Sequence, residues 1–134
     1  MKTHKYNACP VYYNPFCDFT SESNFVKGLP GFIFFASKWE LSVYKSLLQL
    51  TNNVLLQQRF KLLESSLVID FVLTAEDGNL ICVEAKGYQT QLWKLKFKQF
   101  RSLYPDIRIF VIRTNTELVQ AIKFLSLLKF RENT

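Results

Sequence analysis

Two apolar runs joined by a turn constrain the fold of this chain more than any other stretch of its sequence. Residues 69–87 read IDFVLTAEDGNLICVEAKG, and their valine, isoleucine and phenylalanine content is typical of β-strands. Between the runs, the Glu-Asp-Gly sequence at 76–78 predicts a three-residue turn with Gly78 in the left-handed conformation. Such a turn pairs Ala75 with Asn79 and makes the two runs an antiparallel hairpin.

Charged residues interrupt both runs at positions that this register brings together. Side chains alternate between the two faces of a strand, so Glu84 and Lys86 share a face of the second strand. In the first strand, strict alternation places Asp70 on one face with Val68 and Val72, and the register sets Asp70 opposite Glu84. Directly paired residues have Cβ atoms about 5 Å apart. Two carboxylates and an amine are therefore expected on one patch of the sheet.

Two carboxylates at that separation repel each other unless one takes up a proton or a cation lies between them. Lys86 is one candidate for that cation, and a divalent metal ion is another. Hard oxygen ligands on rigid strands, few in number and open to solvent, suit Mg²⁺, which keeps several waters and shares its remaining positions with phosphate oxygens. The group predicts phosphodiester hydrolysis, in which Lys86 orients or deprotonates water or stabilises negative charge.

Helical and extended patterns alternate along the rest of the chain. Ser37 and Glu40 have the spacing of a capping box that opens a helix, and Trp93 and Phe97 recur at helical spacing before Pro105. These patterns predict a short extended run at 32–35, helices at about 37–51, 91–103 and 116–129, and strands at about 54–63, 66–74, 79–86 and 107–112. The last helix is expected to bury Leu118, Ile122, Leu125 and Leu128.

The element order predicts an α/β fold with a mixed central sheet flanked by helices. A helix separates strand 79–86 from strand 107–112, so these two strands are expected to be parallel. The length of 134 residues favours a single domain, 1–134, with its own core. Within it, residues 34–130 are expected to form the core, and residues 1–33 an irregular N-terminal arm that packs on the body or on a second subunit.

Composition narrows the class of protein. No apolar run approaches the roughly 20 residues that span a bilayer, and the first residues lack the apolar core of a signal peptide, so we expect an intracellular, cytoplasmic protein with no membrane contact. The three cysteines form no paired pattern and are expected to be free thiols. A net charge of +6 is a weak bias toward polyanions such as nucleic acid.

The spacing of Asp70, thirteen residues, and then Glu84-Ala85-Lys86 resembles the catalytic core of the PD-(D/E)XK nuclease superfamily. The expected element order matches the αβββαβ core of that superfamily, which is restriction-endonuclease-like. Ile69 stands where the motif has proline. Two further features tighten the match: Ser37-Lys-Trp-Glu40 at the first helix and Gln57-Gln58 in the first strand. The run from 35 to 104 is similar to small phage-type endonucleases and to the nuclease subunit of heteromeric transposases.

The resemblance implies roles for particular residues. Asp70, Glu84 and the helix residue Glu40 would bind the metal, and Lys86 would serve catalysis. Glu40 has an alternative role as the capping-box residue of its helix. Gln58 would contact DNA, or it simply fills a polar strand position. A basic group on the following helix, expected to contact DNA phosphates, comprises Lys94, Lys96, Lys98 and Arg101.

We therefore expect a Mg²⁺-dependent endodeoxyribonuclease, with Mn²⁺ as a substitute metal. Its substrate would be branched DNA, a specific duplex site or a transposon end, and symmetric substrates favour a homodimer. The resemblance also implies a partner protein of a recombination or transposition system. Two alternatives stay open: a non-catalytic nucleic-acid-binding module that retains the fold, and a structural or interaction protein in which Lys86 neutralises the two acids.

Overall fold

The chain divides into two compact units, one ending at Val43 and one beginning at Tyr44. The structure is a computed structural model, and it describes residues 9–133. The boundary falls inside helix α1, Lys38–Leu48, and lies later in the chain than the arm boundary expected after residue 33.

The N-terminal unit contains a small antiparallel sheet, so the expectation of an irregular arm was wrong for this part of the chain. Its strands, in the order β2-β1-β3, are β1 Val11–Asn14, β2 Phe19–Ser21 and β3 Ile33–Phe35, with a 3₁₀ turn η2 at Asn24–Val26. The strands are three or four residues long, which is too short to give a readable alternation in the sequence. Asp18, in the left-handed conformation at φ 53°, accepts a hydrogen bond from the Tyr13 hydroxyl at 2.7 Å.

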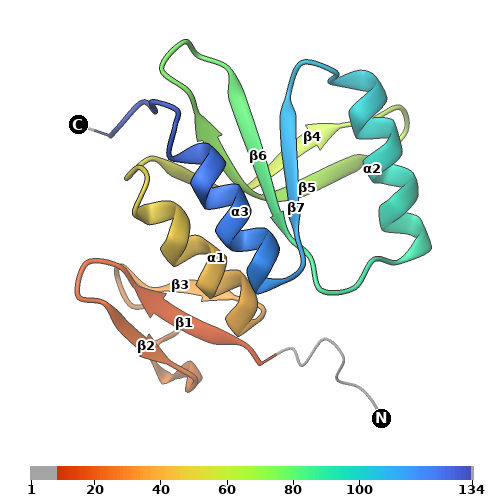
Figure 1. Ribbon diagram of the computed structural model, residues 1–134. Helices are drawn as coiled ribbons and strands as arrows, with labels where there is room; N and C mark the ends of the chain where they lie inside the picture. The colour runs from red at the N-terminus through yellow and green to blue at the C-terminus, as the bar shows by residue number, and fades with distance from the viewer. Residues whose placement is uncertain (1–8, 134) are drawn as a thin grey trace. The chain divides into compact units, whose positions relative to one another are not determined.

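The C-terminal unit is built on a four-stranded mixed sheet, which confirms the predicted α/β class. The elements after α1 are β4 Val54–Lys61, β5 Ser66–Thr74, β6 Leu80–Ala85, α2 Gln91–Leu103, β7 Arg108–Ile112 and α3 Asn115–Leu125. The strand order is β4-β5-β6-β7, antiparallel except for the predicted parallel pair of β6 and β7 (Figure 1). Helix α2 has the predicted bounds, and its N-cap Thr90 accepts a hydrogen bond from the Trp93 amide.

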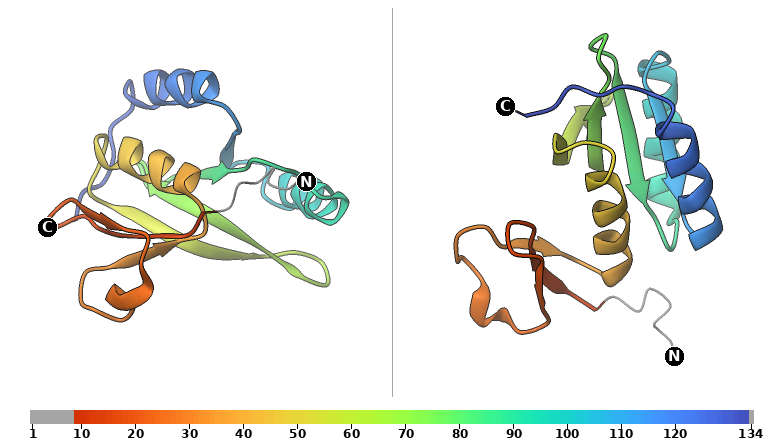
Figure 2. Two further views of the ribbon diagram at one scale, coloured as in Figure 1. Left: turned by 90° about the horizontal axis from the view of Figure 1, so that it is seen from below. Right: turned by 60° about the vertical axis from the view of Figure 1, so that its left-hand side comes forward.

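Helices cover both faces of this sheet (Figures 1 and 2). On one face, Trp93 and Phe100 of α2 pack in a buried cluster with Cys82 of β6. On the other face, Tyr44 of α1 stacks on Phe71 of β5 with ring centroids 5.9 Å apart. Helix α3 packs on β7. Among the described residues, no helix has both the length and the hydrophobicity needed to cross a bilayer.

The last helix is shorter than the sequence suggested. Helix α3 ends at Leu125, and Leu128, expected to point inward, is 37% exposed. The chain leaves the helix because its next residues pair with the end of β5: the Glu76 amide donates to the Lys129 carbonyl at 2.9 Å, and Ala75 forms a bridge with Phe130. Backbone pairing with the sheet replaces the last helical turn.

The hairpin has the predicted register. Thr74 pairs with Leu80 and Phe71 with Val83, and the Ala75 amide donates to the Asn79 carbonyl at 2.8 Å. Gly78 adopts φ 96°, a conformation that residues with a Cβ rarely take. The turn therefore sets the pairing that leads to Asp70.

The alternation of faces along β5 breaks at Asp70, contrary to the strict alternation expected there. Ile69 and Val72 both belong to the cluster that packs against α2, although they are three residues apart. Phe71 lies on the opposite face, against α1. Asp70 therefore lies at an irregular point in the strand, where its side chain is free to turn toward neighbouring backbone groups.

Candidate active site

Regular strand pairing stops on both sides of Asp70. The β5–β6 ladder ends with the pair Phe71 and Val83. The β4–β5 ladder pairs the residues before and after Gln57 but omits Gln57 itself, which faces Asp70. Gln57 has φ 50°, an uncommon conformation for a residue other than glycine. Three strands thus lose their regular hydrogen bonds at one level of the sheet.

The two carboxylates occupy this gap and bond reciprocally to the opposite strand. Asp70 Oδ2 accepts a hydrogen bond from the Ala85 amide, and Glu84 Oε1 accepts one from the Asp70 amide, both at 2.9 Å. These bonds replace ladder bonds and fix the two side chains to the backbone. The sequence prediction that Asp70 and Glu84 meet is confirmed.

The outer oxygens have one donor each. Gln57 Nε2 donates to Asp70 Oδ1 at 3.2 Å, and Trp93 Nε1 donates to Glu84 Oε2 at 3.3 Å. A carboxylate oxygen has two lone pairs, so each of the four oxygens keeps acceptor capacity after these bonds. The pair is held in place, and its oxygens can still accept from a water or bind a cation.

Lys86 lies beside the acids, as predicted. Its Nζ is 3.9 Å from Glu84 Oε2 and 5.1 Å from the centroid of the Trp93 ring. Its backbone amide donates to the Ile112 carbonyl, which continues the parallel pairing with β7 beyond the end of β6. Strand pairing therefore fixes the backbone of Lys86. Its amine approaches Glu84 from the α2 side, over the Trp93 ring.

Burial raises the pKa of both acids. Glu84 is 4% exposed, and loss of water, followed by the nearby charge of Asp70, raises its pKa to about 8. Burial also raises the pKa of Asp70, against the opposing effect of the Ala85 hydrogen bond. Without a cation between them, the pair therefore holds a proton at neutral pH. Burial raises the pKa of the nearby Cys82 to about 12, so this thiol is protonated at neutral pH in the metal-free protein.

Two residues of this site were given no role in it from the sequence: Gln57, which was noted only as part of the Gln57-Gln58 pair, and Trp93. Gln57 contacts Asp70, whereas the predicted Gln58 donates from Nε2 to the Leu56 carbonyl at 2.8 Å. A β4–β5 register would have singled out Gln57, because it is the residue opposite Asp70. Trp93 was assigned to the core from its helical spacing, and it lies there while also donating to Glu84.

Glu40 lies in the first turn of α1, in the N-terminal unit. The Ser37 hydroxyl accepts a hydrogen bond from the Glu40 amide at 3.2 Å, which is the backbone half of the predicted capping box. The role of Glu40 as a metal ligand stays a prediction. Within residues 9–133, no three histidine, cysteine or acidic side chains gather as a potential metal site.

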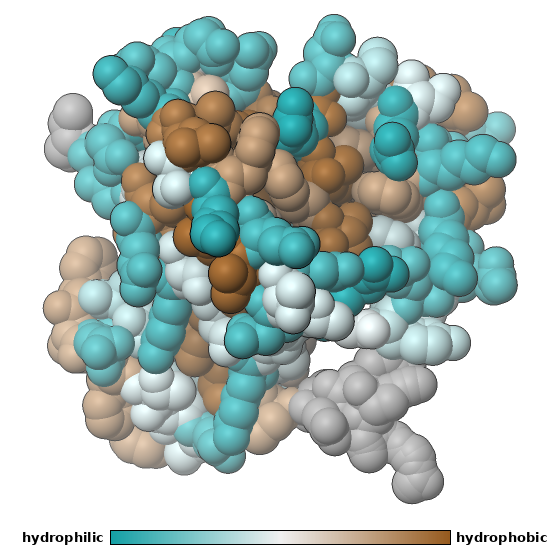
Figure 3. Space-filling model, in the orientation of Figure 1, coloured by the Kyte–Doolittle hydropathy of each residue, from teal (hydrophilic) through white to brown (hydrophobic). Residues whose placement is uncertain are grey.

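The predicted basic group lies along the outer side of α2. Lys94, Lys98 and Arg101 are exposed and Lys96 is partly buried. In Figure 3, hydrophilic side chains predominate at the right-hand edge of the view, where α2 lies. Trp93, near the start of this helix, contacts Glu84 and Lys86. The cations farther along the helix therefore lie progressively farther from the acid pair.

No protein-family model, curated protein or solved structure matches this chain. The function of the protein is therefore inferred from the geometry of this site.

Proposed function

We propose that this protein is a Mg²⁺-dependent endodeoxyribonuclease with a restriction-endonuclease-like αβββαβ core. The observation that carries the proposal is the hydrogen-bonded pair of Asp70 and Glu84 on neighbouring strands, with the Lys86 amine 3.9 Å from Glu84. The order of one helix, three strands, a helix and a strand from α1 to β7 supports the fold assignment.

The donor set fits Mg²⁺ better than a metal that needs a full protein cage. Two carboxylates face each other, and each oxygen keeps a lone pair. Magnesium in phosphate chemistry takes one or two carboxylates and fills its other positions with water and substrate phosphate. Asp70 and Glu84 would hold the ion, which supplies charge stabilisation at the phosphate and a lowered pKa for water. Mn²⁺ has similar ligand preferences and would substitute.

The side chains of the site have separate tasks in this proposal. The Ala85 and Asp70 amides fix the orientation of the two carboxylates, so little reorganisation is needed when a cation and DNA arrive. The Lys86 amine has three donors, and it orients the attacking water or stabilises the charge that develops on the phosphate. Gln57 and Trp93 hold the outer oxygens.

DNA would be bound first through its phosphates. The exposed cations of α2 lie on the helix that follows β6 and Lys86, and they would contact the backbone on either side of the cut. Branched DNA, a specific duplex site and a transposon end are all substrates that this surface would accept. Because one site cuts one strand, we propose a homodimer for substrates with two symmetric cuts, with a partner protein of a recombination or transposition system as a further component.

The deciding experiment is a cleavage assay with labelled four-way junction, flap, linear duplex and single-stranded DNA. Each is incubated with the protein in Mg²⁺, in Mn²⁺ and in chelator. We expect cleavage only with metal, and the product pattern identifies the substrate. Asp70→Asn, whose fold is checked by thermal melting, serves as the control and should give no products.

One observation favours a second function. Every oxygen of the acid pair already has a donor, and Lys86 partly neutralises Glu84, which is also what a structural acid pair needs. A structural protein predicts no metal binding by calorimetry and no affinity for DNA at low salt. A non-catalytic nucleic-acid-binding module predicts DNA binding that survives in Asp70→Asn, with no hydrolysis by either protein in any metal.

A further inference from the structure

The side chain of Trp93 contacts two charged groups of the candidate active site. Its Nε1 donates to Glu84 Oε2 at 3.3 Å, and the Lys86 Nζ lies over its ring, 5.1 Å from the centroid. An ammonium group within about 6 Å of an aromatic face is attracted to it, and tryptophan gives the strongest attraction. One indole therefore holds an acid through its N–H and an amine through its ring.

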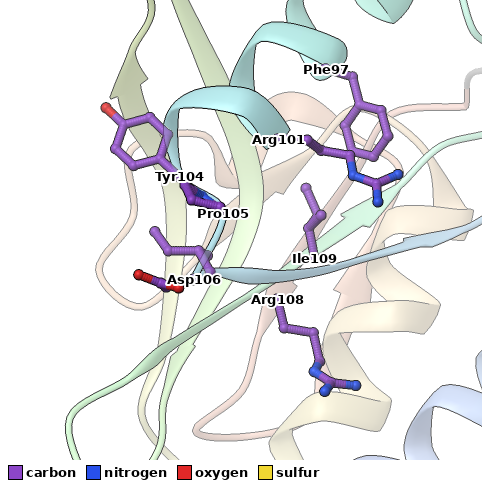
Figure 4. Close-up of a pocket in the computed structure, with 8 residues that line it drawn as sticks. Phe97, Arg101, Tyr104, Pro105, Asp106, Arg108 and Ile109 are labelled. Carbon is purple, nitrogen blue, oxygen red and sulfur yellow. The ribbon is translucent and has the colours of Figure 1, made fainter.

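The Trp93 ring is itself fixed by the elements around it. The Trp93 amide donates to the hydroxyl of the N-cap Thr90 at 3.0 Å, and Phe97 stacks on the ring with centroids 4.8 Å apart and planes 11° apart. Figure 4 shows the Arg101 guanidinium beside the Phe97 ring, 5.8 Å from its centroid, where both residues line a pocket at the end of α2. Trp93 is 8% exposed and belongs to the core cluster. Its ring is thus a rigid support that does not follow movements of the Lys86 side chain.

The Lys86 amine, in contrast, is loosely held by the acid beside it. Its distance of 3.9 Å from Glu84 Oε2 makes an ion pair but is too long for a hydrogen bond. The side chain is 25% exposed and has a flexible four-carbon stem. A cation bound at Glu84 would neutralise that acid and repel the amine. The attraction between the amine and the Trp93 ring does not depend on the charge of Glu84.

We propose that Trp93 is a positioning residue, which keeps the Lys86 amine beside the acid pair while a divalent cation occupies that pair. An uncharged ring is suited to this task, because it attracts the amine without competing for the cation. An aliphatic side chain would fill the same space and leave the amine free to turn into solvent. This inference rests on the proposed function, in which the amine acts on water or on the phosphate.

NMR spectra of the protein labelled with ¹³C-lysine test the contact without DNA. Protons held over an aromatic ring resonate upfield because of its ring current. We therefore expect the ε-methylene signal of Lys86 upfield of those of the other lysines, both in chelator and in Mg²⁺, and Lys86→Arg assigns the signal by removing it. Trp93→Phe, which keeps a ring and loses the N–H, should retain part of the upfield shift. Trp93→Leu should lose the shift entirely.

Single-turnover cleavage tests the consequence for the reaction. Trp93→Leu should cleave about 10²-fold more slowly at saturating DNA, because a misplaced reacting group costs about this factor, with unchanged affinity for DNA in chelator. Trp93→Phe should stay much closer to wild type, so that the difference between the two variants reports the ring and not the N–H. Phe100→Leu, which shortens a fully buried aromatic of the same helix, is the matched control. It should lower the melting temperature but leave the Lys86 signal and the cleavage rate unchanged.

The wild-type spectrum needs no Trp93 variant, so it decides the contact even when Trp93→Leu does not fold. A Lys86 signal that coincides with the other lysines, or that joins them in Mg²⁺, would overturn the proposal. Equal rates of cleavage by wild type and a folded Trp93→Leu would do the same. An upfield Lys86 signal in a protein that never cleaves refutes only the nuclease. Cleavage by a protein whose Lys86 signal is unshifted refutes only the role of Trp93.

Discussion

At the scale of single residues, the site is a compromise between burial and charge. Glu84 is buried next to a second acid, and each carboxylate is held by a backbone amide of the opposite strand. Burial raises the pKa of both acids, the charge of Asp70 raises that of Glu84 further, and a pair so placed favours a cation between its members. Lys86, at 3.9 Å from Glu84, offsets part of this repulsion. The following four predictions separate the roles of individual side chains.

Lys86→Ala should abolish cleavage and leave metal binding nearly intact. The amine acts on water or on the phosphate in our proposal, and loss of such a group lowers rates by about 10²–10⁴-fold. Mn²⁺ binding is measured by calorimetry and cleavage by single-turnover assays. Asp70→Ala is the comparison and should lose both properties. Wild-type cleavage by the Lys86 variant would remove the proposed role of this residue.

The stability of the metal-free protein should fall as the pH rises from about 4.5 to about 8. The pKa of Glu84 is 4.5 in its ordinary state and about 8 in the fold, so over this range the folded state holds a proton that the unfolded state has lost. The stabilisation is complete below pH 4.5 and lost once the pH has risen through 8. Thermal melts in chelator should show this slope in the wild type but not in Glu84→Gln.

The same proton links pH to metal affinity. A cation that binds between the acids displaces the proton, so Mn²⁺ should raise the melting temperature more at pH 8 than at pH 6. Calorimetry in buffers of different ionisation enthalpy should detect the proton release. An affinity for Mn²⁺ that is the same at both pH values would contradict the placement of the ion.

Gln57→Asn should reduce metal affinity or cleavage about 10–100-fold with little change in stability. Asparagine tolerates the left-handed conformation at position 57, but its shorter side chain no longer reaches Asp70. Gln57→Gly gives the matched control for the backbone, because glycine removes the conformational strain as well as the amide. Both variants should be at least as stable as wild type in denaturant unfolding and equally impaired in activity. Full activity in either variant would show that the hydrogen bond from Gln57 to Asp70 contributes nothing to metal binding or cleavage.

At the scale of elements, helix α2 has two distinct faces. Trp93 and Phe100 are buried against the sheet, whereas Lys94 and Lys98 are exposed. Its N-cap Thr90 and the predicted stop at Pro105 set its length, and its apolar spacing sets which side faces the core. The proposed DNA surface thus follows directly from the amphipathic pattern of one helix.

Lys94→Gln/Lys98→Gln should weaken binding to all DNA sequences and flatten the salt dependence. Each phosphate contact adds about 0.9 to the slope of log K against log salt concentration, so loss of two contacts lowers the slope by about 2. Binding is measured by anisotropy over a range of salt concentrations in chelator. The control Arg59→Gln/Lys123→Gln removes the same charge from exposed positions outside α2, and it should keep the wild-type slope. An unchanged slope in the α2 variant would exclude this face as the phosphate surface.

At the scale of the whole molecule, residues far apart in the chain close the C-terminal unit. After α3, residues 129–131 pair with the end of β5, and Asn133 bonds to Asn52 in the loop before β4. The Asn52 side chain accepts from the Asn133 amide at 2.6 Å and donates to its carbonyl at 3.2 Å. The C-terminal residues therefore extend the sheet beside β5.

Asn52→Ala should lower the free energy of unfolding by about 1 kcal/mol, since exposed hydrogen bonds contribute modestly. The midpoint of urea unfolding measures the effect. Gln120→Ala, at an exposed position of α3, serves as the control and should be close to neutral. A variant as stable as wild type would mean that the bonds to Asn133 do not stabilise the fold.

The sequence by itself determined those features that depend on neighbouring residues. Turn chemistry at Gly78 set the register of the hairpin, and with it the meeting of Asp70 and Glu84. Periodicity and capping set the bounds of α2. These signals are local, because a turn type or a helical repeat is defined by residues a few positions apart.

Only the tertiary structure decided what surrounds the acids. The break in strand pairing at Gln57 and Asp70, the bond from Trp93 to Glu84, and the pairing of residues 129–131 with β5 all join segments distant in the chain. Strands β1 and β2 of the N-terminal unit also escaped prediction, whereas the extended run at 32–35 became β3. Such contacts depend on which surfaces pack together, and packing is a property of the assembled core that no short window of sequence contains.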